Sequence, residues 1–383
     1  MIGGLEGVRI IEMGGPPGAF GTALLGDHGA DVIRIARPAA GASVGASVGL
    51  NKGSPMDRNR RAIAVDMTHP AAAEAVLALV AKADVMIEGF RPGVTERMGI
   101  GPAHCLARNP KLIYARMTGW GQEGPWANRA GHDVNYTAIS GTLSSIGHTD
   151  GPPVMPVNYL GDWAGGLLLA FGIVIALRAA EREGVGQIVD AAMLDSAALL
   201  ASVQHAGVNK GTWIEKRASN LSDGGWPHYS IYETADHQHV AVGALEPKFF
   251  YEMMKRLGFA RDETPDPNDQ SRWPALRQML EDRLAMKSRD KWVEIMGDAD
   301  TCFTPILSMT EALSHPHNVA RQTFVDYDGT MAPAPAPRLS RTPARYRPWS
   351  ECAVDTATTL AGWDFSPSEI EVLLNGGAMK DVV

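Results

Sequence analysis

The chain has 383 residues, enough for one large or two ordinary domains, each with a sizeable core. Hydrophobic residues make up 45% and charged residues 20%, a globular balance that excludes a disordered or fibrous protein. The formal net charge is −8 and no basic block occurs, so nucleic acid is not an expected partner.

Three cysteines, Cys105, Cys302 and Cys352, are widely spaced and form no CxxC pair. This usage fits a reducing compartment and argues against structural zinc, so we expect a cytoplasmic protein. The chain opens without the basic and apolar runs of a signal peptide. Its most hydrophobic stretch, residues 164–177, is shorter than the roughly 20 residues that span a bilayer, so we expect a buried core helix and no membrane insertion.

The first half alternates short β-rich runs with helical stretches. Strands are expected at 8–13, 31–35, 62–66, 85–88 and 112–117, and helices at 19–28 and 70–83. Such alternation is typical of a parallel, doubly wound α/β sheet with crossover helices. Between the second and third strands, residues 39–59 are rich in Gly, Ala and Ser, which suits either a surface loop or a lid over a ligand.

The second half is expected to contain a smaller α+β domain. A helix over 163–183, a strand over 187–191 and a helix from Ser196 precede a stretch of turn residues at 220–227. A hairpin at 229–233 and 239–243 follows, with helices at 247–257, 273–286 and 289–296. The Pro-rich tail, 328–349, indicates an extended connector, and a last helix is expected at 366–375.

The first βα turn does not carry a dinucleotide fingerprint. Residues 14–21 lack the GxGxxG order, and Pro16 and Pro17 remove backbone donors that a pyrophosphate needs. Where an acidic residue contacts ribose in such folds, this chain has Arg34 and Arg37. These cations suit the phosphate of coenzyme A or of NADP, or are ordinary surface arginines.

A second group of residues follows the strand at 85–88. Gly89 and Gly93 allow close approach of a ligand to the backbone, and Arg91 offers a planar fork to an anion. The loop lies at the carboxyl end of a strand, where open α/β sheets bind ligands. A purely structural turn explains the same residues.

Three residues are candidates for acid–base work. His132 lies in a glycine-flanked loop, where it is either a general base or a side chain satisfied by Asp133. Asp162 directly precedes an apolar helix. It is either the N-cap of that helix, or an acid that acts beside the exposed N–H groups of the helix, which can stabilise an oxyanion. Glu246 precedes Pro247 at a helix start, either as a cap or to orient an imidazole.

Five segments occur in the order of a known family: 88–97, 114–122, 131–136, 161–166 and 242–247. Together they make the chain resemble the α-methylacyl-CoA racemases, a branch of the family III CoA-transferase superfamily. The resemblance runs from about Leu5 to the last helix. It implies a discontinuous large Rossmann-like domain, residues 1–200 with 330–383, a linker at 201–224, and a small domain at 225–329.

The resemblance also implies an interlocked homodimer, with each cleft between the large domain of one chain and the small domain of the other. His132 and Asp162 are similar to the family's two proton-transfer residues, and Glu246 would support His132 from the partner chain. The positions that match the family's coenzyme A contacts are Arg37, Val65, Asp66, Met67, Thr68, Gly89, Phe90, Arg91, Arg97, Gly131, Asp133, Asn135 and Tyr136. Relatives often have a lysine at the position of Thr68, and the segment 39–59 is longer than usual.

The activity that this implies is inversion of C2 in 2-methylacyl-CoA thioesters, a step of lipid metabolism. One group removes the α-proton and another, on the opposite face, returns one, so no metal or redox cofactor is expected and CoA enters as part of the substrate. His237 with His239 and His315 with His317 have metal-like spacings but lack a matching third ligand.

Two other functions remain open from the sequence. A CoA-transferase would use Asp162 as a nucleophile and pass CoA to another acid through a mixed anhydride. A non-catalytic acyl-CoA binding protein would keep the fold and lose the chemistry, although the presence of His132, Asp162 and Glu246 argues against it. The sequence does not specify the acyl chain.

Overall fold

The computed structural model describes residues 3–38, 54–352 and 354–381. These form two compact units, one of residues 1–141, 156–200 and 322–383, the other of residues 142–155 and 201–321. Residues 142–155 group with the second unit, whereas the sequence suggested the first. Residues 201–224, expected as a linker, contain a helix of the second unit. Most of the expected lid or surface loop, residues 39–53, lies outside the described residues.

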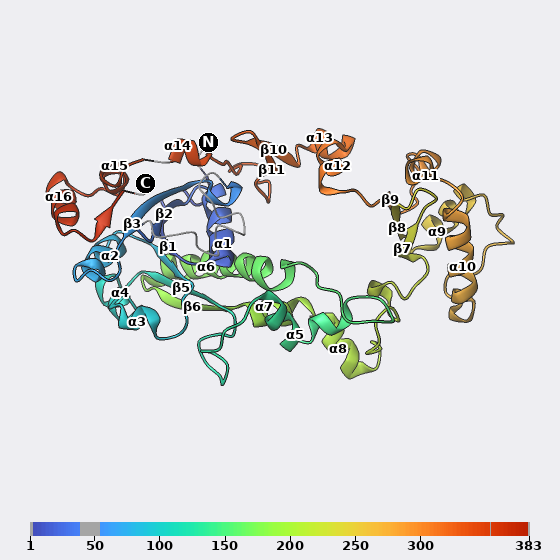
Figure 1. Ribbon diagram of the computed structural model, residues 1–383, viewed down its shortest axis with the longest axis horizontal. Helices are drawn as coiled ribbons and strands as arrows, with labels where there is room; N and C mark the ends of the chain where they lie inside the picture. The colour runs from blue at the N-terminus through green and yellow to red at the C-terminus, as the bar shows by residue number, and fades with distance from the viewer. Residues whose placement is uncertain (1–2, 39–53, 353, 382–383) are drawn as a thin grey trace. The chain divides into compact units, whose positions relative to one another are not determined.

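A seven-stranded sheet is the centre of the first unit (Figure 1). Its strands are β1 (Arg9–Met13), β2 (Asp31–Ala36), β3 (Arg60–Val65), β4 (Val85–Glu88), β5 (Ile113–Thr118), β6 (Gln187–Ala192) and β12 (Met379–Lys380). The order across the sheet is β12-β3-β2-β1-β4-β5-β6, and all neighbours are parallel except β12 with β3. This confirms the prediction of a doubly wound α/β fold.

Helices cover both faces of this sheet, as near-continuous apolar strands require. The helices of the unit are α1 (Pro16–Asp27), α2 (Ala72–Val80), α3 (Val94–Arg97), α4 (Pro102–Arg108), α5 (Asp133–Ile139), α6 (Ala164–Glu183), α7 (Met193–Leu200), α14 (Trp349–Cys352), α15 (Thr356–Ala361) and α16 (Pro367–Asn375). One buried cluster joins the sheet to α1 and α6, and another joins its opposite face to α2, α4 and α15.

Helix α6 is buried on one side only. Leu169 and Ile173 face the core beside β5, while Leu167, Phe171 and Ile175 are more than half exposed. Among the residues described, the segment Tyr159–Glu183 is the one with the length and apolar composition of a membrane span, and 39% of its most apolar part is buried.

The tail expected as an extended connector contains a hairpin, so that prediction was wrong in part. Strands β10 (Phe324–Tyr327) and β11 (Thr330–Pro333) pair antiparallel. Asp328 and Gly329 connect them, both with positive φ, as a two-residue hairpin turn requires. The Asp-Gly pair was the available signal for this turn.

The helix expected from Ser196 begins earlier, at Met193, and a new helix starts at Ser202.

The second unit contains a three-stranded antiparallel sheet packed against helices. The strands are β7 (Tyr229–Glu233), β8 (His239–Gly243) and β9 (Phe303–Pro305), with β8 in the middle. The helices are α8 (Ser202–Lys210), α9 (Pro247–Arg256), α10 (Trp273–Leu284), α11 (Arg289–Met296), α12 (Met309–Ser314) and α13 (Pro316–Arg321). Phe250, Leu276 and Trp292 belong to its buried core.

Candidate active site

The order of the sheet reverses between β1 and β4, and ligands of open α/β sheets bind at such a point, outside the carboxyl ends of the strands. The loops after β1 and β4 touch here. Gly89 N donates to Met13 O at 3.0 Å. A Cβ on Gly89 would lie 3.2 Å from Gly15 N and 3.3 Å from Gly14 Cα, so a larger residue would separate the two loops.

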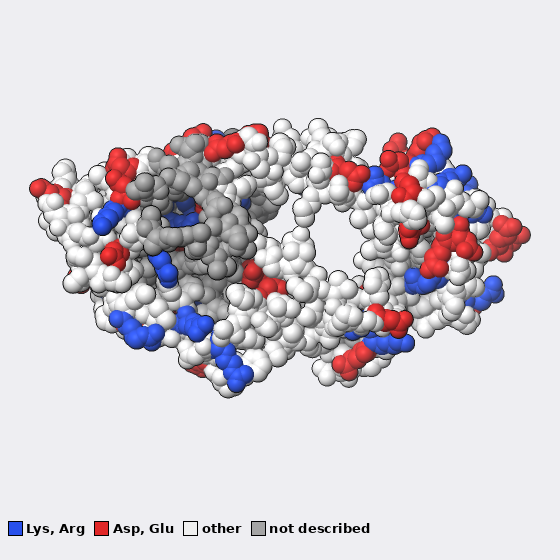
Figure 2. Space-filling model, in the orientation of Figure 1, with Lys and Arg blue, Asp and Glu red and all other residues white. Residues whose placement is uncertain are grey.

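Exposed arginines lie beyond the carboxyl ends of β2 and β4. Arg37 follows β2, Arg91 lies in the loop after β4, and Arg97 ends α3. Figure 2 shows basic side chains gathered over α3 and the loops beside it. Arg34, the other cation singled out in the sequence, differs because its Nη1 lies 2.9 Å from Asp57 Oδ1. The protein itself therefore engages Arg34, whereas Arg37 is exposed.

The end of β3 combines buried and exposed positions. Val65 is buried and pairs with Met379 of β12. The backbone N and hydroxyl of Thr68 donate to Asp66 Oδ1 at 3.0 and 2.6 Å. These hydrogen bonds lower the pKa of Asp66. Met67 packs against the core, so Thr68 is the exposed residue of this segment.

His132 lies at the N-cap of α5, in extended conformation, with an exposed side chain. Its backbone N donates to Asn135 Oδ1 at 3.0 Å. The Tyr136 hydroxyl donates to Gly131 O, and the Tyr136 ring packs edge-on against Trp120 with centroids 4.7 Å apart. These contacts fix the backbone of His132, whose side chain stays exposed.

Asp133 joins the two candidate proton-transfer residues. Its Oδ2 accepts from Gly161 N at 2.7 Å and from Asp162 N at 2.9 Å. A Cβ on Gly161 would lie 2.6 Å from that oxygen, so this approach requires glycine. Asp133 therefore ties the loop of His132 to the turn of Asp162, and its carboxylate does not serve to satisfy the His132 ring.

Asp162 lies within a π-helical turn, Tyr159–Trp163, so it is not the N-cap of α6. Its Oδ2 accepts from Asn158 Nδ2 at 3.1 Å. Burial raises the pKa of Asp162, and the nearby charge of Asp133 adds to this. The Asn158 hydrogen bond and the charge of His132 act in the opposite direction but do not reverse it. A carboxyl group that holds its proton more tightly than usual suits an acid.

The glycines after Asp162 do not leave room for a ligand, contrary to the expectation from the sequence. A Cβ on Gly165 would lie 2.5 Å from Met117 Cε, and one on Gly166 would lie 2.4 Å from Pro17 O. They allow α6 to pack closely against the sheet and α1. The N–H groups of Gly161 and Asp162 are engaged by Asp133, so they are not free to stabilise an oxyanion.

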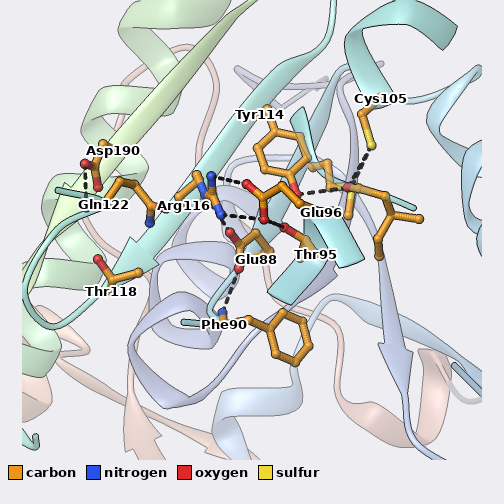
Figure 3. Close-up of polar contacts among 12 residues, drawn as sticks. Glu88, Phe90, Thr95, Glu96, Cys105, Tyr114, Arg116, Thr118, Gln122 and Asp190 are labelled. Carbon is orange, nitrogen blue, oxygen red and sulfur yellow. Dashed lines mark hydrogen bonds and ion pairs between the residues drawn. The ribbon is translucent and has the colours of Figure 1, made fainter. Parts of the chain in front are cut away.

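The charges of Asp162 and Arg91 both act on one hydroxyl group, that of Tyr136. The pKa of Tyr136 is raised to about 12, mainly by burial; the charge of Asp162 acts in the same direction and the charge of Arg91 in the opposite one. Both charged groups thus lie within electrostatic reach of the same hydroxyl. Figure 3 shows a further polar group beside this loop, around Arg116, which the sequence analysis did not identify. Asn158 was also missed, although it lies four residues before Asp162.

Glu246 belongs to the second unit. It occupies the N-cap of α9 and is exposed, and its side chain makes no capping hydrogen bond. Its backbone O accepts from the N atoms of Phe249 and Phe250, each at 3.0 Å. Burial raises the pKa of the Cys302 thiol, and the Glu246 charge adds to this.

In the described part of the chain, no three His, Cys, Asp or Glu residues group as metal ligands.

The fold is that of an open α/β protein, and the loop with Arg91 lies at the reversal point of its sheet, where ligands of such sheets bind. The family model of CoA-transferase family III matches residues 5–350, and the chain belongs to this family. It is 39% identical over 371 residues to a mouse protein named alpha-methylacyl-CoA racemase, covering 96% of this chain and 95% of that protein. The human protein of that name is 38% identical, over 89% of this chain and 87% of that protein.

Other relatives differ in name. An acetyl-CoA:oxalate CoA-transferase from Acetobacter aceti is 30% identical, over 88% of this chain and 90% of that protein. A solved structure of a CAIB/BAIF family protein from Brucella suis has a TM-score of 0.76 at 24% identity, covering 90% of this chain and 95% of that one. Rv3272 from Mycobacterium tuberculosis has a TM-score of 0.74 at 25% identity, covering 91% of this chain and 96% of that one.

Proposed function

We propose that the protein is an isomerase that inverts C2 of 2-methylacyl-CoA thioesters. The observation that carries the proposal is the link through Asp133, which holds the loop of His132 and the turn of Asp162 together. The racemase names of the relatives at 38–39% identity support the same reaction. The acyl chain is left open.

The chemistry follows from two groups on opposite faces of the α-carbon. Neutral His132 removes the C2 proton from one enantiomer, and the electron pair moves into the thioester to give an enolate. The Asp162 carboxyl then gives its proton to the other face of C2, and the enolate collapses back to the thioester. In the reverse direction the two residues exchange roles. The oxidation state of the substrate does not change, so the step needs no redox cofactor, and the proposed mechanism uses no metal.

Coenzyme A binding is assigned to the carboxyl edge of the sheet. Arg37, Arg91 and Arg97 are exposed there and present planar donors to phosphate oxygens. Gly89 to Arg91, the segment 65–68 and residues 131–136 complete the proposed contacts. Within the last of these, the carboxylate of Asp133 is engaged inside the protein, so the backbone is the available contact.

The active form is proposed to be an interlocked homodimer in which Glu246 of one chain supports His132 of the other. The exposed apolar face of α6, with Leu167, Phe171 and Ile175, supports association because monomeric proteins rarely expose contiguous apolar patches of this kind. A second copy, rather than a bilayer, is the proposed cover. We place the protein in the cytoplasm, in keeping with free Cys105, Cys302 and Cys352.

A second candidate is CoA transfer with Asp162 as the nucleophile, which the 30% identical oxalate CoA-transferase favours. A nucleophilic carboxylate must be ionised, whereas burial raises the pKa of Asp162. A raised pKa makes the carboxyl group easier to protonate. This suits proton transfer, in which Asp162 is acid in one direction and base in the other, better than a nucleophile that acts only as the anion.

Incubation of a single 2-methylacyl-CoA enantiomer in D₂O tests the proposal. We expect deuterium at C2 together with loss of optical purity, with no acceptor acid present. His132→Ala is expected to lower exchange by about 10²- to 10⁴-fold, the usual contribution of a general base, while CoA still binds. Absence of exchange in the wild type, with CoA passed to an added carboxylate, would establish the transferase instead. Unchanged exchange in His132→Ala would remove His132 from the mechanism.

A further inference from the structure

One buried guanidinium connects two strands and a helix beside the arginine loop (Figure 3). Arg116 of β5 is the cross-strand partner of Glu88, the last residue of β4. Arg116 Nε donates to Glu88 Oε1 at 2.7 Å, and Arg116 Nη1 donates to Glu96 Oε1 of α3 at 2.8 Å. The Arg116 side chain is 8% exposed and that of Glu88 is fully buried. We call these three residues the Arg116 bracket.

The Arg116 bracket holds both ends of the loop after β4. Glu88 Oε2 accepts from Phe90 N at 2.7 Å, which fixes the first turn of the loop. Glu96 lies at the other end, and Thr95 donates to Glu96 Oε2 at 3.2 Å. Because Arg116 reaches both carboxylates, it determines how far α3 lies from the end of β4.

The segment held in this way contains two of the exposed arginines. Arg91 lies between the two carboxylates in sequence, and Arg97 directly follows Glu96. Neither arginine belongs to the bracket, whose guanidinium is buried instead. Burial lowers the pKa of Arg116, but hydrogen bonds and charges from both glutamates raise it overall, so the guanidinium stays charged. A planar guanidinium suits this position because its Nε and Nη1 donate to two different carboxylates at fixed angles, whereas a lysine ammonium is a point charge on a flexible stem.

We propose that Arg116 is a positioning residue for coenzyme A: through Glu88 and Glu96 it fixes the segment 89–97, so that Arg91 and Arg97 face the anionic part of the ligand. The inference rests on the proposed function, because it takes these arginines as CoA contacts. Arg116 itself touches no ligand atom. Its effect therefore belongs to binding of the CoA moiety and not to proton transfer at C2.

The test measures the Kd of CoA by calorimetry, a readout that does not depend on turnover. Arg116→Lys and Glu96→Gln are each expected to weaken CoA binding about tenfold, roughly the value of one charge-assisted hydrogen bond. KM for the thioester rises in parallel, while kcat at saturation stays within about twofold. Glu96 is 42% exposed, so Glu96→Gln is decisive even if Arg116→Lys does not fold.

Glu311→Gln is the matched control. In the second unit, Arg289 is 9% exposed and Glu311 41% exposed, with Arg289 Nη2 donating to Glu311 Oε1 at 2.6 Å. This pair has the same chemistry and burial as Arg116 with Glu96 but lies in another unit. Glu311→Gln is expected to lower the melting temperature as Glu96→Gln does, without a change in the Kd of CoA.

A double-mutant cycle separates positioning from a general loss of structure. Arg91→Ala removes one proposed phosphate contact, and in that background Glu96→Gln is expected to weaken CoA binding less than in the wild type. The positioning role is overturned if the effects of Arg91→Ala and Glu96→Gln on the free energy of CoA binding are additive. It is also overturned if folded Glu96→Gln binds CoA with an unchanged Kd. If the wild type itself neither binds CoA nor exchanges the C2 proton, the proposed function fails first.

Discussion

The proposed role of Asp162 as a proton donor comes with a cost in stability. Burial raises its pKa from the ordinary value of 3.8, and the charge of Asp133 adds to the shift. A carboxyl group can have a higher pKa in the folded chain than in the unfolded chain. At a pH between these two pKa values the folded chain keeps the proton, whereas the unfolded chain has released it. Stability then falls as the pH rises through the interval between the two values. Asp162 therefore occupies a position that disfavours the ionised form of its carboxyl group.

Asp162→Asn is therefore expected to stabilise the protein while removing its activity. The amide keeps an oxygen for the Asn158 hydrogen bond and carries no charge to desolvate. The gain in melting temperature over the wild type should be small below pH 3.8 and grow as the pH rises. Thermal unfolding at a series of pH values measures it, with exposed Asp150→Asn as the control. A gain that shrinks with rising pH contradicts the assigned direction of the shift.

At the scale of the element, the glycines of α6 matter more for packing than for catalysis. Gly166 allows α6 to meet α1 closely, since a Cβ there would lie 2.4 Å from Pro17 O. Gly172 of the same helix differs, because its nearest neighbour would be the side-chain atom Val189 Cγ1 at 3.1 Å. A side-chain methyl group can shift, whereas a backbone oxygen held in a helix cannot do so cheaply.

Gly166→Ala is expected to lower the free energy of unfolding by about 1–3 kcal/mol, because the overlap outweighs a helix-propensity gain of about 1 kcal/mol. Gly172→Ala receives the same propensity gain with a smaller steric cost, so its change should stay within about 1 kcal/mol. Urea unfolding of both variants supplies the comparison. If the two alanines behave alike, close packing of α1 and α6 is not the reason for glycine at position 166.

The alternation of short apolar runs with helical stretches predicted the parallel sheet. A strand that is buried on both faces has a continuous apolar sequence, so it can be recognised without its neighbours. Short elements escaped prediction. Helix α5 has only seven residues, too few to display an apolar period, and its start is marked by Asn135 bonding back to His132. Strand β12 has two residues and exists only through pairing with β3. Such elements depend on tertiary contacts and carry little local signal.

At the scale of the whole molecule, the candidate site divides into parts that the sequence shows and parts that it does not. His132 and Asp162 lie in segments whose flanking glycines and apolar helix draw attention to them. Arg116 and Glu88 are 28 residues apart, and only the parallel register of β4 with β5 makes them neighbours. A side-chain contact between two strands that are distant in sequence cannot be predicted until the order and register of the strands are known.

The proposed interlocked dimer makes a prediction about which chain completes each site. If Glu246 supports His132 from the partner chain, a heterodimer of His132→Ala with Glu246→Ala has one site with both substitutions and one with neither. We expect this heterodimer to retain about half of the wild-type exchange rate, while each variant homodimer loses about 10²-fold or more. Coexpression with two different affinity tags isolates the heterodimer, and doubly tagged wild type is the control.

The opposite arrangement has a different outcome, because each site then carries one substitution. If Glu246 acts within its own chain, both sites of the heterodimer are impaired and exchange falls to the level of the homodimers. Recovery of only singly tagged monomers contradicts the dimer itself and leaves the exposed apolar face of α6 without a second copy to cover it. The half-activity result is specific to shared sites, since restoring one intact centre requires that His132 and Glu246 come from different chains.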